Sequence, residues 1–74
     1  MKIYTYTWRD EAGHHRGWDR LKSRALRDNI YAIRSPGADP GQEPDVEEIK
    51  FTPSMRDMLR LLNQYATRAD EHQE

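Results

Sequence analysis

The chain has 74 residues, which suits one domain, and no run of apolar residues approaches the roughly 20 needed for a membrane helix. It contains no cysteine, so neither a disulfide nor a thiolate metal site can stabilise the fold. With 35% hydrophobic and 34% charged residues, the chain has a small hydrophobic core at best. The net charge of −1 divides unevenly, because residues 1–34 carry eight basic and four acidic side chains, whereas residues 35–74 carry four basic and nine acidic ones.

The N-terminal segment predicts a β-strand over residues 2–9, rich in β-branched and aromatic types. Its aromatic residues alternate with a period of two, which places Tyr4, Tyr6 and Trp8 on one face of the strand. Residues 10–13 then predict a turn, and residues 14–16 a short return strand.

Residues 18–28 predict the first helix, with an apolar stripe on one side and a row of arginines opposite; the stripe consists of Trp18, Leu21, Ala25 and Leu26. Asn29 is a candidate helix stop, and residues 30–33 predict a further strand. Residues 35–46 contain three prolines and two glycines, which predicts a long irregular loop that is functional or mobile.

The C-terminal part predicts a strand over residues 47–52 and a helix over residues 55–70. Two N-terminal caps are possible for this helix: Thr52 followed by Pro53, or a capping box formed by Ser54 and Asp57. Residues 71–74 are expected to fray. We therefore expect one α+β domain over residues 1–70. Its three- to four-stranded, mainly antiparallel sheet would carry both helices on one face, in ββαββα order.

The first candidate site is basic. The predicted helix places Arg20, Arg24 and Arg27 on successive turns, with Arg16 and Lys22 nearby. Guanidinium groups make bidentate contacts with carboxylates or phosphates, so an acidic protein surface is the expected target. The alternative is an ordinary solvated helix face, partly neutralised by acidic neighbours.

The aromatic row Tyr4, Tyr6 and Trp8 offers a nucleic-acid interpretation, because exposed aromatics on a strand stack bases. Burial of this row beneath the helices is the competing interpretation, since aromatic side chains bury the most area. A sequence pI near 6.3 also argues against a nucleic-acid footprint, which is normally basic.

A second candidate surface is acidic and follows the predicted loop, where five carboxylates could meet a basic partner. They are Asp39, Glu43, Asp45, Glu47 and Glu48. The sequence has no phosphate-binding loop, nucleophile elbow or cysteine nucleophile, and its adjacent histidines suit opposite faces of a strand. We therefore expect no enzyme activity, no cofactor and no metal.

These observations favour a non-catalytic protein-interaction module located in the cytoplasm, such as an accessory or inhibitor protein of a phage that binds a larger host assembly, as anti-CRISPR proteins do. Nucleic-acid binding through the basic helix and the aromatic strand is the alternative. The small core also favours a homodimer, formed through the wide apolar face of helix 55–70.

Overall fold

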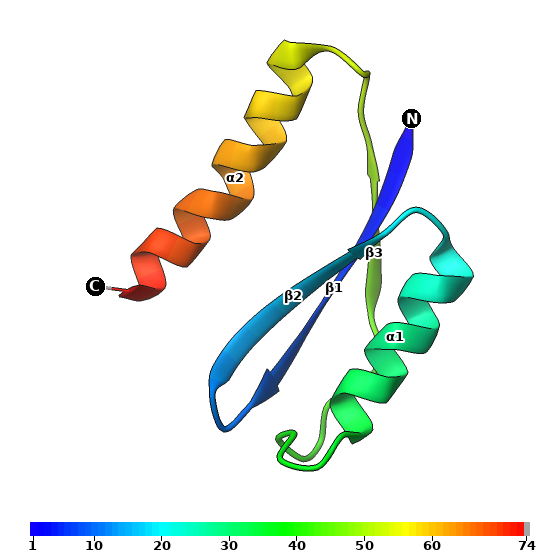
Figure 1. Ribbon diagram of the computed structural model, residues 1–74, viewed down its shortest axis with the longest axis vertical. Helices are drawn as coiled ribbons and strands as arrows, with labels where there is room; N and C mark the ends of the chain where they lie inside the picture. The colour runs from blue at the N-terminus through cyan, green and yellow to red at the C-terminus, as the bar shows by residue number, and fades with distance from the viewer. Residues whose placement is uncertain (74) are drawn as a thin grey trace.

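The computed structural model describes the backbone of residues 1–73 and the side chains of residues 1–65. It confirms a small α+β fold, with three antiparallel strands and two helices (Figure 1). In chain order the elements are β1 (Lys2–Asp10), β2 (Gly13–Asp19), α1 (Lys22–Arg34), β3 (Val46–Lys50) and α2 (Met55–Gln73). None of the described helices is both long and apolar enough to cross a membrane.

The strand predicted at residues 30–33 is wrong, because these residues continue α1. The order is therefore ββαβα. Asn29 does not stop the helix, which continues to Arg34. The C-cap residue Ser35 follows, and its hydroxyl donates to the carbonyl oxygen of Tyr31 at 2.6 Å, just before Pro36. The first helix also begins later than predicted, at Lys22, since Trp18 belongs to β2.

β1 lies at the centre of the sheet, in the order β2-β1-β3, and is antiparallel to both neighbours. The hairpin register runs from Tyr4 opposite Asp19 to Asp10 opposite Gly13, whose φ of 116° suits the glycine turn. Gly17 faces Tyr6, and a Cβ at this glycine would overlap the Tyr6 ring. The bare backbone of β2 therefore makes room for the aromatic row.

The two helices lie on opposite sides of the sheet, so the prediction of both on one face is wrong (Figure 1). α1 crosses from β2 to β3 over the face that carries Tyr6, whose hydroxyl is close enough to Asp28 of α1 to be affected by its charge. α2 lies on the other face, where Tyr65 packs edge-on against Trp18 with ring centroids 5.0 Å apart. The layers are thus helix, sheet, helix.

Fully buried side chains are few and small. Within residues 1–65 they are Thr5, Ala25 and Asn29. Asn29 joins three segments, because its Nδ2 donates to the carbonyl oxygen of Thr7 at 3.1 Å and its Oδ1 accepts from the N–H of Asp45 at 2.8 Å. At the centre of the fold, Ala25 therefore allows close packing, and the buried Asn29 side chain has hydrogen-bond partners for its polar groups.

The loop from Ser35 to Asp45 contacts the end of β1 through one glutamine. The Gln42 side chain accepts from the N–H of Arg9 at 2.7 Å and donates to its carbonyl oxygen at 2.9 Å, as a neighbouring strand would. The N–H of Asp39 donates to the same carbonyl at 3.0 Å. The loop is anchored at this point, and its mobility stays a prediction.

Helix α2 begins with the predicted Ser54 and Asp57 box rather than with a Thr52 cap. The Ser54 hydroxyl accepts from the N–H of Asp57 at 3.2 Å. The backbone N–H and hydroxyl of Thr52 donate to the Asp57 carboxylate, which lowers the pKa of that carboxyl. The helix runs to Gln73 instead of ending near Asp70. Most of the tail predicted to fray is therefore helical, and residue 74 lies outside the described residues.

Candidate protein-interaction surfaces

The side of α1 that faces away from the sheet forms a shallow groove of about 430 Å³. We call this surface the outer face of α1; it is lined by Ser23, Leu26, Arg27, Ile30, Tyr31 and Arg34. Tyr31 is 69% exposed and Leu26 is 40% exposed, so large apolar groups stand in solvent here. Their placement follows from helical spacing, because Ala25 and Asn29 occupy the side that touches the sheet.

Arginines border these apolar groups with little internal compensation. Arg24 and Arg34 form no ion pair within the described part of the chain, and Arg27 Nε lies 3.7 Å from Asp28 Oδ1 in an exposed pair. Exposed pairs of this kind contribute little to stability. The arginines on this helix are therefore available to an external carboxylate or phosphate.

The other members of the predicted basic cluster lie elsewhere. Arg20 belongs to the turn before α1, where its N–H donates to the Asp19 carboxylate at 2.8 Å, and Lys22 is the first residue of the helix. Arg20, Arg24 and Arg27 therefore do not occupy successive turns of one helix. Arg34, which was not among the predicted site residues, joins the outer face instead.

Arg16 lies on the opposite side of the sheet from α1. Its guanidinium lies 4.5 Å from the ring centroid of Tyr65 and 5.8 Å from that of Trp18, and its Nη1 donates to Thr5 Oγ1 at 2.9 Å. These contacts engage Arg16 in holding α2 to the sheet. It is separated from the arginines of α1 by the sheet itself.

The predicted acidic residues do not form one surface. Glu47 and Glu48 are consecutive in β3 and point to opposite faces, with Glu48 accepting from the Tyr4 hydroxyl at 3.2 Å. Asp39 lies in the loop beside β1. Glu43 and Asp45 border a polar groove of about 490 Å³ that includes residues at the β1–β2 hairpin end.

The aromatic row is covered in part by α1. Tyr6 and Trp8 stack with ring centroids 5.7 Å apart, and Trp8 stacks on His15 at 5.2 Å. Burial, and then the charges of Asp28 and Asp19, raise the pKa of the Tyr6 hydroxyl. Tyr4, Tyr6 and Trp8 are each partly buried, which leaves them a poorer stacking platform than an open row would be.

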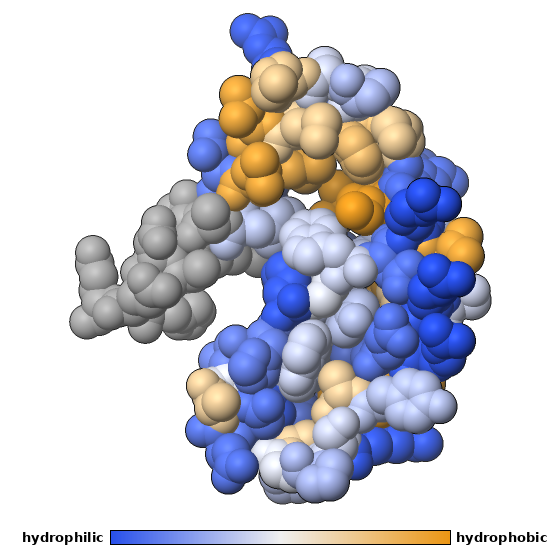
Figure 2. All heavy atoms as spheres, viewed as in Figure 1, coloured by the Kyte–Doolittle hydropathy of each residue, from blue (hydrophilic) through white to orange (hydrophobic). Residues whose placement is uncertain are grey.

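Helix α2 leaves apolar side chains in solvent. Met55 is 74% exposed, Leu62 64%, Leu59 49% and Met58 47%. Figure 2 shows hydrophobic residues gathered around the N-terminal half of this helix. Among residues 55–65 of this helix, the partly buried side chains are Asp57, Leu61 and Tyr65.

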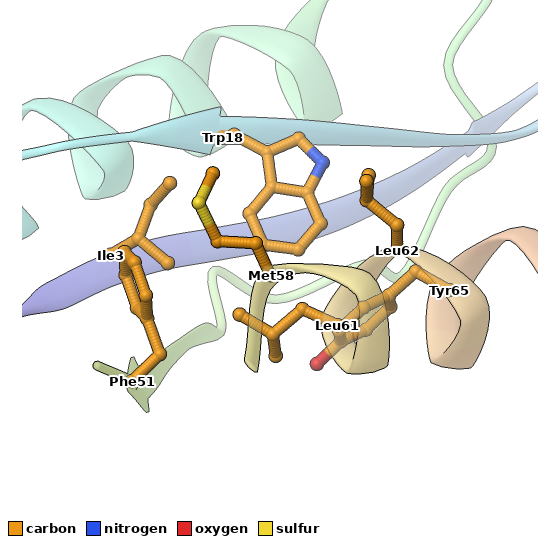
Figure 3. A pocket seen from close by; sticks show the side chains of 7 residues that line it. All are labelled: Ile3, Trp18, Phe51, Met58, Leu61, Leu62 and Tyr65. Carbon is orange, nitrogen blue, oxygen red and sulfur yellow. The ribbon is translucent and has the colours of Figure 1, made fainter. Parts of the chain in front are cut away.

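Between α2 and the sheet is an open apolar cleft of about 380 Å³ (Figure 3). Its walls are Ile3, Trp18, Phe51, Met58, Leu61, Leu62 and Tyr65. The sequence indicates the helical half of this cleft through the wide apolar stripe of helix 55–70. It misses the sheet half, because Trp18 fits the stripe of the first predicted helix equally well.

Two titratable side chains meet at the β1–β2 hairpin. His15 Nε2 lies 2.8 Å from Asp10 Oδ1, whereas His14 belongs to the other face of β2. Within the described residues, no three histidine, cysteine, aspartate or glutamate side chains gather as metal ligands. The His15 contact is the main cause of a lowered pKa at the Asp10 carboxyl.

Comparison with known proteins finds no matching family model, no matching curated protein and no matching solved structure.

Proposed function

We propose that this chain is a small non-catalytic protein-interaction module that binds an acidic patch on a larger protein through the outer face of α1. The observation that carries the proposal is the exposure of Leu26 and Tyr31 between arginines that are unpaired or loosely paired. Interface hot spots favour this combination of aromatic and arginine side chains.

The physical basis is complementarity. Arg27 and Arg34 of the outer face, with Arg24 on the same helix, present planar donors that make paired contacts with carboxylates, while Tyr31 and Leu26 supply apolar area. The basic N-terminal half would also steer an acidic partner toward this helix. The proposed biological class is a cytoplasmic accessory or inhibitor protein of a phage or mobile element, for which the support is small size and divided charge.

Nucleic-acid binding is the second candidate, favoured by the same exposed arginines on one helix. It differs in its dependence on salt, because phosphate contacts release counterions and affinity then falls steeply as salt rises. A titration of Trp8 and Trp18 fluorescence with mixed oligonucleotides at low and moderate salt separates the two. A salt-sensitive response would replace the protein-binding proposal.

The direct test reverses the two charges on the outer face of α1 with Arg27→Glu and Arg34→Glu. A partner is first captured from a host lysate, purified and titrated against the wild-type chain. We expect the double variant to weaken binding by at least about 100-fold, since each charged contact contributes roughly 1.5–3 kcal/mol.

The matched control is the Arg9→Glu and Lys50→Glu double variant, which makes the same charge change at exposed sheet positions. It should bind nearly as tightly as the wild-type chain. Equal losses in both double variants would show only a general charge effect, and unchanged affinity in the α1 variant would contradict the assignment of this face.

A further inference from the structure

Helix α2 has a wider apolar surface than the sheet covers. At 100° per residue, its apolar side chains span an arc of about 160° from Leu61 to Leu59, uninterrupted by any charged residue in the described part of the helix. An arc of about 100° is enough for a helix that packs on one surface. The remainder, with Met55, Leu59 and Leu62, faces solvent.

The whole chain also exposes more surface than a compact domain of its size. It exposes 5984 Å², whereas a compact monomer of this mass exposes about 4,800 Å². Its radius of gyration is 13.4 Å, compared with about 11 Å for a compact domain of this length. The surplus of about 1,200 Å² exceeds the roughly 800 Å² that each partner buries in a standard stable interface.

We propose that a second copy of this chain covers the apolar cleft and the exposed arc of α2, forming a two-fold symmetric dimer with the two α2 helices in contact. A second copy presents the same exposed apolar arc, so one contact would cover these side chains in both protomers. Two-fold dimers are also the commonest closed assembly.

The geometry of the cleft suits this occupant. The cleft has a volume of about 380 Å³, which is close to that of one turn of a helix about 10 Å across. It therefore has room for side chains of the second copy but not for a whole helix. The arc around Leu59 and Leu62 contains no charged side chain, because Arg56 and Arg60 lie beyond its edge, about 60° and 100° from Leu59 around the helix. The same apolar surface therefore serves both protomers.

Sedimentation equilibrium of the full chain provides the first test. We expect the wild-type chain to have twice the mass of one chain, and the Leu59→Glu and Leu62→Glu double variant to have half that mass. Gln64→Glu is the matched control, because Gln64 is exposed on the opposite side of the same helix and should leave the dimer intact.

Cysteine cross-linking keeps the proposal testable if the double variant does not fold. The chain has no cysteine of its own, so the single variants Met55→Cys, Leu59→Cys and Leu62→Cys each introduce one thiol. We expect at least one of them to form an interchain disulfide much faster than Gln64→Cys does.

Two results would overturn the proposal. One is a monomeric wild-type chain at every concentration up to the millimolar range. The other is a dimer whose three cysteine variants cross-link no faster than the control. Neither result would affect the partner-binding proposal, because that surface lies on α1, across the sheet from the cleft.

Discussion

Asp10 ends β1 with a carboxylate that is held from two directions. His15 Nε2 lies 2.8 Å from its Oδ1, and the N–H of Ala12 donates to the same oxygen at 2.8 Å. Both contacts favour the charged carboxylate, and together they lower its pKa from the ordinary value of 3.8. Through His15, which stacks on Trp8, the Asp10 carboxylate thus links the hairpin turn to the aromatic side chains of β1.

The lowered pKa fixes the direction of a pH dependence. A carboxyl whose pKa is lower in the folded chain stabilises the fold above its ordinary pKa, and this contribution is lost as the pH falls through the lowered value. We expect Asp10→Asn to destabilise the chain at about pH 5 and to have a smaller effect at about pH 2. Urea unfolding at both pH values measures the difference, and an equal loss at both would contradict it.

At the residue scale, the sequence predicts which side chains alternate along β1 but not what faces them. Tyr4, Tyr6 and Trp8 share a face as predicted, and burial under a helix was one of the two interpretations considered. The fit of Tyr6 over Gly17 depends on the hairpin register. That register extends β2 to Asp19, three residues beyond the return strand that the sequence predicts over residues 14–16.

At the element scale, the largest error concerns residues 30–33. Ile30 and Ile33 favour strands as β-branched residues, yet this preference is weak, and tertiary packing outweighs it. Asn29 was expected to end the helix, but its side chain is used in the core instead. Local propensity gives no sign of such a long-range hydrogen bond.

Asn29 therefore provides the element-scale prediction. Truncation by Asn29→Ala leaves the Thr7 carbonyl and the Asp45 N–H without their partner and opens a small cavity between α1 and the sheet. We expect a loss of about 2–4 kcal/mol in the free energy of unfolding. Chemical denaturation followed by tryptophan fluorescence measures it.

The control for this substitution is Gln64→Ala, at an exposed position of α2. It should change the unfolding free energy by less than about 0.5 kcal/mol. Equal effects at the two sites would mean that Asn29 does not anchor α1, β1 and the loop before β3.

At the scale of the whole molecule, the sequence predicts the fold class and the marginal core, because both follow from composition and length. It does not predict that the helices separate onto opposite faces. That arrangement requires both faces of β1 to be packed, by the aromatic row on one side and by Ile3 with Trp18 on the other. A three-layer molecule of this size divides its apolar residues between two half-filled layers, which explains why so few side chains are fully buried.

If the second layer is completed by another copy of the chain, stability must depend on protein concentration. Unfolding of a dimer releases two chains, so mass action raises the midpoint temperature as the concentration increases. For a dimer of two 74-residue chains, we expect an increase in protein concentration of about 100-fold to raise that midpoint by roughly 10 °C. Calorimetry over this range measures the shift. The Leu59→Glu and Leu62→Glu variant, if it folds, should melt at one temperature throughout, and a concentration-independent wild-type midpoint would contradict an obligate dimer.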